Sequence, residues 1–337
     1  VPKLRFPEFR DAEEWDAKEL KDACQMQAGK FVSASEIQEH RNSELYPCYG
    51  GTGLRGYTKS FTHNGKYSLI GRQGALCGNV TLANGKFHAT EHAVVVTPKD
   101  DVNTDWLFYK LNLLNLNRYA TGQAQPGLSV ENLEKVRIQI PRLKDEQQKI
   151  ADCLTSVDEL LTAQTQKLDA LETHKKGLMQ QLFPAEGETV PKLRFPEFRD
   201  KGGWGEIELG QLGELVSGLT YSPADIRDEG LLVLRSSNVQ NGMIALEDNV
   251  FVRSDIKGAN PSKPNDILIC VRNGSKSLIG KNALIPEGMP PCTHGAFMTV
   301  FRSKSAKFIF QLFQTGAYER QVSADLGATR NSINGNQ

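Results

Sequence analysis

The chain has 337 residues, a length typical of about two domains, and its 40 basic and 40 acidic residues leave no net charge. A hydrophobic content of 39% is that of a globular protein and excludes a disordered chain. No apolar run approaches the ~18 residues of a membrane span, and the N-terminal residues lack the apolar core of a secretory signal. We therefore expect a cytoplasmic protein, and the zero net charge argues against a histone-like polycation.

The cysteines are scattered along the chain, and no two of them have the C-x-x-C spacing of a zinc or redox site. We predict free thiols, which are typical of reducing compartments. The residues concerned are Cys24, Cys48, Cys77, Cys153, Cys270 and Cys292.

An internal repeat organises the chain. Residues 1–11 and residues 190–200 both read VPKLRFPEFRD, and Trp15 matches Trp204 at the same offset. Eleven identical residues are not a chance event, so the chain consists of two copies of one unit.

The two copies diverge after this opening but keep a common frame. Arg72 faces Arg272 at an offset of 200, and residues 127–130 face residues 330–333. Each copy therefore combines a shared frame with its own variable central segment. Recognition of an asymmetric, two-part target requires this arrangement. A solenoid would instead keep its period throughout.

A long helix is predicted between the copies. Residues 136–141 alternate as a strand and end in proline, after which residues 142–182 contain no proline until Pro184. Eight of ten heptad positions are apolar, which predicts a coiled-coil helix roughly 55–60 Å long. The alternative is an ordinary amphipathic helix lying on a domain. The apolar heptad positions are Ile150, Leu154, Val157, Leu161, Leu168, Leu171, Leu178 and Leu182, and Gln164 and Lys175 are the polar ones.

The predicted fold class is α+β, with two mixed α/β domains joined by this helix. We expect a first domain at residues 1–141, a spacer helix at 142–184 and a second domain at 185–337. Gly- and Asn-rich turns separate the predicted strands Tyr67–Ile70, Ala93–Thr97, Asp266–Val271 and Phe297–Phe301. The predicted domain helices are Thr104–Leu116, capped by Thr104, and Ala306–Thr315.

Charge is segregated along the neutral chain. Residues 45–90 contain five Lys or Arg and no acid, and residues 249–286 contain six basic residues against two acids. Basic, Gly-rich segments with interspersed tyrosines suit DNA, because Lys and Arg neutralise phosphates while Arg, Asn and Gln read base edges. The alternative is a solvated surface whose acids come from elsewhere in the fold.

Two motifs resemble catalytic signatures but lack their context. His88-Ala-Thr-Glu-His92 matches the zinc motif H-x-x-E-H, which requires a helix, whereas a turn and a strand surround it here. Gly51-Thr-Gly-Leu-Arg-Gly56 lacks the following helix of a nucleotide site. We therefore expect neither an enzyme nor a cofactor. A metallohydrolase built on His88 and His92 stays as a minor alternative.

Three further motifs support a family resemblance. They are the repeated PKLRFPEF opening with its Trp, the run TGQAQPGLSV at residues 121–130, and Ile140-Pro141 followed by Glu146-Gln147. This pattern resembles the specificity subunit of type I restriction–modification systems. The resemblance implies two target recognition domains, each of which reads half of a bipartite DNA sequence. It also implies spacer helices that dock methyltransferase subunits, and a complex that recruits restriction and translocation subunits. The family pattern leads us to expect a second spacer helix, before which this sequence stops.

The basic segments and the resemblance together suggest a set of DNA-facing residues. They are Arg55, Tyr57, Lys59, Lys66, Arg72, Gln73, Gln123, Gln125, Arg235, Asn238, Arg272, Asn273, Lys276, Lys281, Arg330 and Asn331. The unpaired helix leads us to expect self-association through its apolar heptad positions. The competing interpretation is a tandem protein-interaction module that dimerises through the coiled coil.

Overall fold

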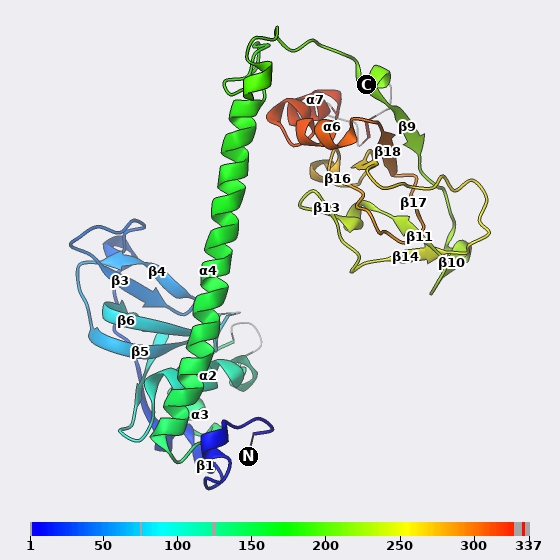
Figure 1. Ribbon diagram of the computed structural model, residues 1–337. Helices are drawn as coiled ribbons and strands as arrows, with labels where there is room; N and C mark the ends of the chain where they lie inside the picture. The colour runs from blue at the N-terminus through cyan, green and yellow to red at the C-terminus, as the bar shows by residue number, and fades with distance from the viewer. Residues whose placement is uncertain (1, 75, 123–125, 327–331, 334–337) are drawn as a thin grey trace. The chain divides into compact units, whose positions relative to one another are not determined.

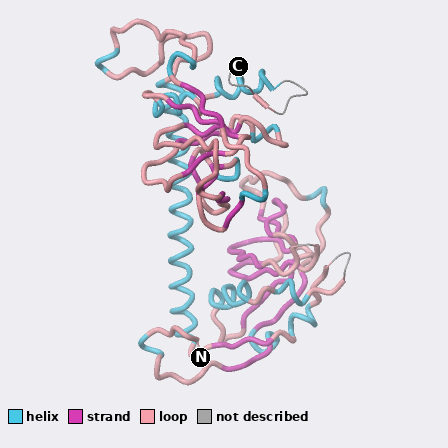
Figure 2. Tube along the Cα trace, turned by 90° about the vertical axis from the view of Figure 1, so that its right-hand side faces the viewer, coloured by secondary structure: helices cyan, strands magenta, loops and turns pink. Residues whose placement is uncertain are grey.

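The computed structural model describes residues 2–74, 76–122, 126–326 and 332–333. The chain forms two compact units, Val1–Asp169 and Ala170–Gln337, and the border between them falls inside the long helix α4 (Lys144–Leu182) (Figure 1). Figure 2 shows strands and long loops within both units. Within the described ranges, no helix is long and apolar enough to cross a membrane.

Unit 1 is built on a six-stranded sheet with the order β2-β7-β5-β6-β3-β4, next to a two-stranded pair β1-β8. The pair joins residues far apart in the chain, because Asp16 pairs with Ile140. The strands are β1 Asp16–Glu19, β2 Cys24–Ala28, β3 Tyr46–Gly50, β4 Gly53–Thr58, β5 His63–Gly71, β6 Val80–Ala89, β7 Ala93–Pro98 and β8 Arg137–Ile140. The helices are α1 Leu20–Ala23, α2 Thr104–Leu113 and α3 Val130–Glu134.

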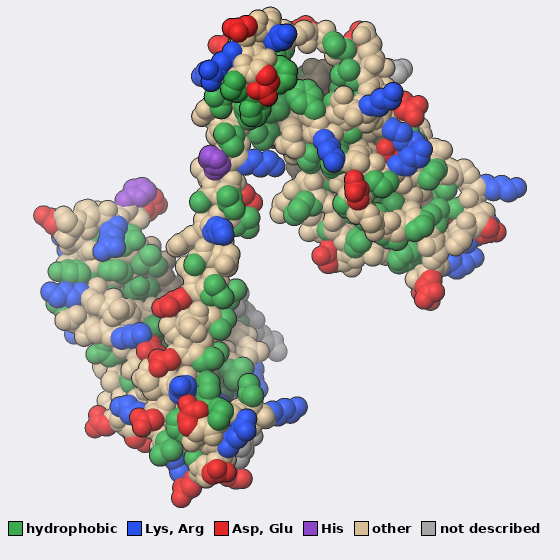
Figure 3. All heavy atoms as spheres, in the orientation of Figure 1, with side chains coloured by type: hydrophobic (Ala, Val, Ile, Leu, Met, Phe, Trp, Pro, Cys, Tyr) green, Lys and Arg blue, Asp and Glu red, His purple; other side chains and the backbone are tan. Residues whose placement is uncertain are grey.

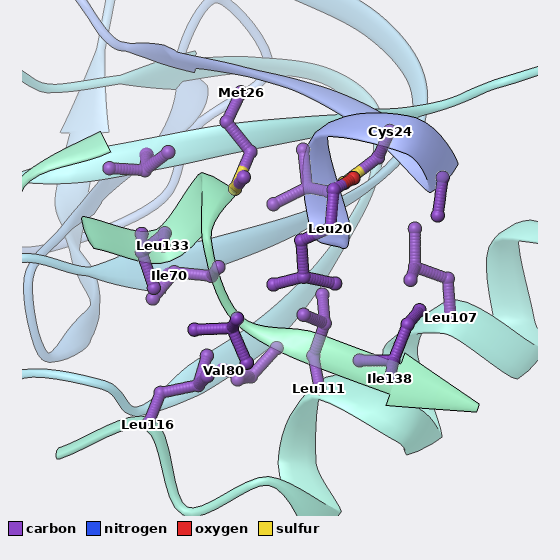
Figure 4. Packing of buried hydrophobic residues seen from close by; sticks show 14 of the residues in the cluster. Leu20, Cys24, Met26, Ile70, Val80, Leu107, Leu111, Leu116, Leu133 and Ile138 are labelled. Carbon is purple, nitrogen blue, oxygen red and sulfur yellow. The ribbon is translucent and has the colours of Figure 1, made fainter. Parts of the chain in front are cut away.

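The main core of unit 1 lies between its sheet and its short helices. Leu20 of α1, Ile70 of β5 and Leu111 of α2 are fully buried in one cluster, together with Leu133 of α3 and Ile138 of β8 (Figure 4). These side chains come from both ends of the unit. The core therefore forms only when α3 and β8 return to the N-terminal segment.

Unit 2 contains two four-stranded sheets, with the orders β16-β15-β18-β9 and β10-β14-β11-β17, and a β12-β13 pair. Its strands are β9 Glu214–Ser217, β10 Ile226–Arg227, β11 Leu231–Leu234, β12 Val239–Gln240, β13 Met243–Ile244, β14 Val250–Val252, β15 Ile267–Cys270, β16 Asn282–Leu284, β17 Cys292–His294 and β18 Met298–Arg302. Its helices are α5 Leu209–Leu212, α6 Ala306–Leu312 and α7 Gly316–Leu326.

The two units share a strand frame. The order β9-β18-β15-β16 in unit 2 repeats β2-β7-β5-β6 of unit 1, as the sequence repeat predicts. Gly29 and Gly218 mark the same close approach, because an added Cβ would lie 2.2 Å from Ala89 O and 2.1 Å from Gly295 O respectively. Larger residues therefore fit at neither position.

One strand differs between the units. Strand β6 of unit 1 pairs with β5 along one part and with β3 along another, whereas unit 2 divides these roles between β16 and β17. Three prolines, Pro286, Pro290 and Pro291, lie between the two short strands. Proline cannot donate to a strand ladder, which explains why the strand is interrupted here.

The predicted elements are found with shifted ends. Helix α2 is capped by Asn103, whose side chain accepts from Trp106 N, so the expected cap at Thr104 is wrong. The helix ends at Leu113 rather than at residue 116, because Asn115 takes a left-handed conformation with φ of 48°. Helix α6 ends at Leu312, short of the expected residue 315.

All six cysteines are free thiols, as the sequence predicts. Five of them are buried and Cys153 on α4 is exposed. Burial raises the pKa of the Cys24 thiol to about 12. A buried thiol that stays protonated is a packing residue rather than a nucleophile.

Candidate nucleic-acid interface

Three basic candidates of unit 1, Arg55, Lys59 and Lys66, come from strands β4 and β5 and the loop between them. Arg55 in β4 and Lys59 in the loop are exposed, while Tyr57 is half-buried. Lys66 of β5 forms an ion pair with Asp105 at the start of α2, with 2.5 Å between Nζ and Oδ1. Part of the positive charge that the sequence places here is therefore neutralised by another element of the fold.

A lysine and two aromatic rings form a cluster that the sequence analysis missed. Lys86 Nζ lies 4.9 Å from the ring centroid of Phe61 and 5.9 Å from that of Tyr46. The two rings meet edge-on with centroids 5.0 Å apart. Such a cluster holds a cation beside an exposed aromatic surface. The available signal was the alternation of basic and aromatic residues in this segment.

The loop after β5 holds the next two candidates. The amide N of Arg72 donates to His92 O, and the carbonyl of Arg72 accepts from Leu128 N. Arg72 is half-buried, whereas Gln73 is exposed and forms a bridge with Gly127. Gln123 and Gln125 lie outside the described residues.

The equivalent loop of unit 2 corrects the register that the sequence suggested. Val271 N and Arg272 N both donate to Phe297 O, but it is Val271 O that accepts from Ile333 N, as Arg72 O accepts from Leu128 N in unit 1. Arg272 instead takes the place of Gln73, since it forms the bridge with Ser332. Arg72 and Arg272 are therefore not equivalent. In extended backbone a shift of one residue turns the side chain to the opposite face.

Arg272 is exposed in this loop. Its guanidinium carbon lies 5.9 Å from the ring centroid of Phe297, which is 58% exposed. Asn273 is tied more closely, because its amide donates to Ser236 Oγ and accepts from Ser275 N. Lys276 is exposed and Lys281 half-buried, while Arg330 and Asn331 lie outside the described residues.

Two candidates of unit 2 stabilise their own loop. Asn238 is fully buried, its amide donates to the carbonyls of Ala245 and Asp248, and its Oδ1 accepts from Arg235 N. Arg235 Nη2 forms an ion pair of 2.9 Å with Asp248. The expectation that Asn238 faces DNA does not agree with this burial, because each polar group of its amide is already used inside the protein.

His88, the first histidine of the zinc-like motif, lies in strand β6 and both of its ring nitrogens are hydrogen-bonded, whereas His92 lies in a turn beside Glu91. His88 Nδ1 lies 3.0 Å from Ser60 Oγ and its Nε2 lies 3.1 Å from Lys30 O. His294 of unit 2 repeats the arrangement with Ser262 at 3.0 Å and Val216 O at 2.8 Å. Across the described ranges, no three His, Cys, Asp or Glu side chains are grouped to hold a metal. The two histidines join segments of the frame.

The long helix has two kinds of surface. In its first turns Glu146, Gln147 and Ala151 are buried against unit 1, and Ile150 packs on the same core. Beyond them the heptad leucines are open to solvent, with exposed fractions of 60% for Leu161 and 56% for Leu168. Figure 3 shows hydrophobic side chains on the surface along the helix. The other open heptad positions are Leu154, Val157, Leu171 and Leu178. The leucines of α4 that belong to unit 1 are therefore not covered by that unit.

Comparison with known proteins agrees with these features. Residues 12–173 match the family model described as Type I restriction modification DNA specificity domain. The chain is 45% identical over 164 residues to the type I restriction enzyme EcoprrI specificity subunit of Escherichia coli, covering 48% of this chain and 40% of that subunit. It is 31% identical over 141 residues to the EcoKI specificity subunit of Escherichia coli strain K12, covering 39% of this chain and 30% of that subunit.

The matched part spans less than half the length of these relatives. The fold is shared more widely. A crystal structure of the S subunit of a type I restriction–modification system from M. genitalium matches with a TM-score of 0.71, covering 99% of this chain and 86% of that chain at 16% identity. The family model and the curated subunits thus match the N-terminal half of the chain, and the fold of nearly the whole chain is that of a solved type I S subunit.

Proposed function

We propose that this chain recognises a bipartite, asymmetric double-stranded DNA sequence as the non-catalytic specificity subunit of a type I restriction–modification complex in the cytoplasm. Each unit reads one half of the target. The observation that carries the proposal is the matched loop after β5 and after β15. The two loops share backbone hydrogen bonds but present different exposed side chains, Gln73 in one and Arg272 in the other.

This difference has a direct chemical meaning for DNA. A glutamine side chain pairs in a bidentate way with adenine, whereas an arginine pairs with guanine in the major groove. Two copies of one frame that present different base-contacting side chains, Gln73 and Arg272, suit a DNA target made of two different half-sites. The other exposed cations, such as Arg55 and Lys59, supply phosphate contacts, which position the protein without reading the sequence.

A segment exchange tests the proposal. Replacing residues 45–135 by the corresponding segment of another family member should change one half of the target and leave the other half intact. The matched control replaces residues 231–333 and should change the opposite half. Methylation mapping in cells that carry the complete system measures both. A change of both halves by one exchange contradicts the modular reading of DNA.

The exposed leucine face of α4 is also compatible with an alternative function, in which the chain is a protein-interaction module that does not bind DNA. Salt dependence separates the two, because phosphate contacts release counterions and a plot of log affinity against log salt then has a steep negative slope. We expect such a slope in gel-shift measurements with DNA that contains the target.

We further propose that residues 142–184 set the spacing between domains at residues 1–141 and 185–337. In this role the helix docks methyltransferase subunits and, through the complex, the restriction subunits. In the isolated chain we propose that α4 pairs with α4 of a second copy, which covers the apolar heptad positions. The proposed pairing residues are Ile150, Leu154, Val157, Leu161, Leu168, Leu171, Leu178 and Leu182.

Sedimentation measures this pairing. We expect the wild-type chain to form a dimer and the double variant Leu161→Asp with Leu168→Asp to be monomeric, because two charges would enter an apolar interface. A matched double variant on the opposite helix face, Gln166→Asp with Ala170→Asp, should remain dimeric. A wild-type monomer at high concentration contradicts the proposal.

A further inference from the structure

The two motifs of unit 1 that resemble catalytic signatures meet at the loop after β5. An added Cβ at Gly51, the first glycine of one motif, would lie 3.3 Å from His92 O and 3.4 Å from Gln73 O. His92 ends the zinc-like motif and follows Glu91 in the turn between β6 and β7. This turn, the glycine and Gln73 are therefore neighbours at one edge of the sheet.

The same turn is present in unit 2. Residues 90–93 and 295–298 are each closed by a hydrogen bond from the last amide N to the first carbonyl, of 2.9 Å and 2.8 Å respectively. The third residue of each turn accepts a main-chain hydrogen bond of 3.0 Å from the loop after β5 or after β15. The turns are thus equivalent position by position. The second and third residues are Glu91 and His92 in unit 1, and Ala296 and Phe297 in unit 2.

The equivalent turns differ in chemistry. In unit 1 the carboxylate Oε1 of Glu91 lies 3.1 Å from Nε2 of His92. In unit 2 the methyl group of Ala296 and the exposed ring of Phe297 take these places. A carboxylate beside DNA is repelled by the phosphates and lowers affinity in general. It contributes to recognition only where a base offers it a hydrogen-bond donor.

Two polar atoms of the unit 1 turn are shielded but unsatisfied. Among the residues that the structure describes, Glu91 Oε2 and His92 Nδ1 are shielded from solvent and form no hydrogen bond. Such groups are unfavourable and rare in folded proteins. The two side chains are 33% and 38% exposed, and rotation of exposed side chains is fast, so these atoms can turn outwards to a partner.

A cation lies beside the turn. An added Cβ at Gly50 would lie 3.7 Å both from Arg55 Cδ and from Thr90 Oγ1, so the arginine stem passes the start of the turn. Arg55 is exposed, and an exposed guanidinium suits a phosphate contact. The turn therefore combines a group that holds the DNA backbone with a carboxylate that accepts hydrogen bonds.

We propose that Glu91 is a specificity-determining residue of unit 1, whose carboxylate accepts a hydrogen bond from the N4 amino group of a cytosine next to the base that Gln73 contacts. His92 is the positioning residue that orients this carboxylate. The assignment rests on the proposed function, DNA recognition, and adds one base to the half-site of unit 1.

The choice of cytosine follows from the chemistry of an ionised carboxylate, which only accepts hydrogen bonds. In the major groove cytosine presents a donor, its N4 amino group. Adenine presents the N7 acceptor next to its N6 donor, and guanine and thymine present acceptors, all of which repel a carboxylate. Unit 2 has no carboxylate at the equivalent Ala296, so this readout belongs to one half-site alone.

Selection from a randomised double-stranded DNA library tests the assignment with the complete complex that contains the full chain. For the wild type we expect a cytosine preference of about tenfold at one position of the unit 1 half-site. Glu91→Gln should abolish this preference, because an amide also donates and so accepts adenine. In gel shifts its affinity for the selected target should fall, while its affinity for DNA of random sequence should rise because a repulsion is removed. An unchanged preference in the other half-site shows that the variant is folded.

The matched control is Asp101→Asn. Asp101 follows the opposite end of β7, and its carboxylate also forms an ion pair of 3.1 Å, with Lys18. This variant should change no base preference. His92→Ala should weaken the same cytosine preference as Glu91→Gln. The double variant should behave as Glu91→Gln alone, because His92 acts only through Glu91.

The possible failures are distinct. A wild-type complex without any sequence preference would overturn DNA recognition itself, and this inference with it. A wild-type preference that Glu91→Gln leaves unchanged, or a uniform loss of affinity for all sequences, overturns this inference alone. So does an equal effect of Asp101→Asn. A base other than cytosine at the position that Glu91→Gln relaxes overturns the chemical assignment.

Discussion

Units 1 and 2 begin with the same eleven residues but use them differently. In unit 1 the opening closes over the start of α4, and Arg5, Trp15 and Glu146 form one buried network. In unit 2 Arg194 has the same main-chain bonds, while Trp204 packs against Phe183 and Phe308 with ring centroids 5.7 Å away. An identical segment therefore has a different energetic role, because the partner that completes it comes from elsewhere in the chain.

The largest expected difference between the units concerns this network. Glu146→Ala should lower the free energy of unfolding of unit 1 by about 3 kcal/mol, because the substitution leaves a buried guanidinium and an indole N–H without their acceptor. Arg194→Ala should lower that of unit 2 by about 1 kcal/mol, since it removes hydrogen bonds at the surface.

Hydrogen exchange during denaturant titration measures the two units separately. Each substitution should affect its own unit and leave the other unchanged. Equal losses for the two variants would contradict the view that the network is completed in unit 1 and open in unit 2.

A smaller difference is expected in DNA recognition. If Gln73 and Arg272 occupy matched reading positions, Arg272→Gln should reduce affinity for the cognate target by about 10- to 100-fold and relax one position of one half-site. Gln73→Arg should alter the other half-site. Arg72→Gln serves as the comparison, because Arg72 is half-buried and matches Val271.

Binding to a panel of single-base variants of the target checks this prediction. We expect Gln73→Arg to change the preference at one base position and Arg72→Gln to leave that position unchanged. If Arg72→Gln changes the same position, the matched register of the two loops does not determine which side chain reads the base.

The smallest expected effect concerns acid sensitivity of unit 2. Burial lowers the pKa of His294, whose imidazole is hydrogen-bonded to Ser262 and Val216 and has Asp266 and Arg302 nearby. The folded state therefore favours the neutral ring. Its contribution to stability is complete above about pH 6.5, and it decreases as the pH falls from there to the lowered folded pKa.

The titration of one histidine changes the free energy of unfolding by at most about 1.4 kcal/mol per pH unit. His294→Gln keeps a hydrogen-bonding side chain that does not titrate here, and it should flatten the dependence of unit 2 stability on pH below pH 6.5. Urea unfolding as a function of pH, followed by exchange in unit 2, measures it. An unchanged profile would mean that another group causes the acid sensitivity.

Much of the architecture could be predicted from local patterns. The heptads predict α4, and alternation predicts both ends of β7, β15 and β18 within one residue, whereas β5 begins four residues before its predicted start. The helix ends were less accurate. Asn103 caps α2 and Asn115 ends it, and both effects depend on individual backbone conformations rather than on periodicity.

The candidate site was predicted less completely. Exposed cations such as Arg55 and Arg272 were recognised from composition, because charged residues are rarely buried. The burial of Asn238 and the ion pair between Lys66 and Asp105 were not, since both depend on partners that come from other segments of the folded chain. Lys86 with Phe61 and Tyr46 was missed because the cluster joins strand β6, the loop after β4 and the start of β3, which are separate in the sequence.

The sequence by itself determined that there are two copies of one unit, that a long apolar-faced helix follows the first copy, and that the middles differ, since repeats and periodicity are properties of the chain. The tertiary structure decided that Arg72 matches Val271 and that Glu146 is buried under Arg5 while Arg194 meets no carboxylate within the described ranges. The reason is physical. Register and burial depend on hydrogen bonds and packing between segments far apart in the chain, and a shift of one residue reverses which side chain is exposed.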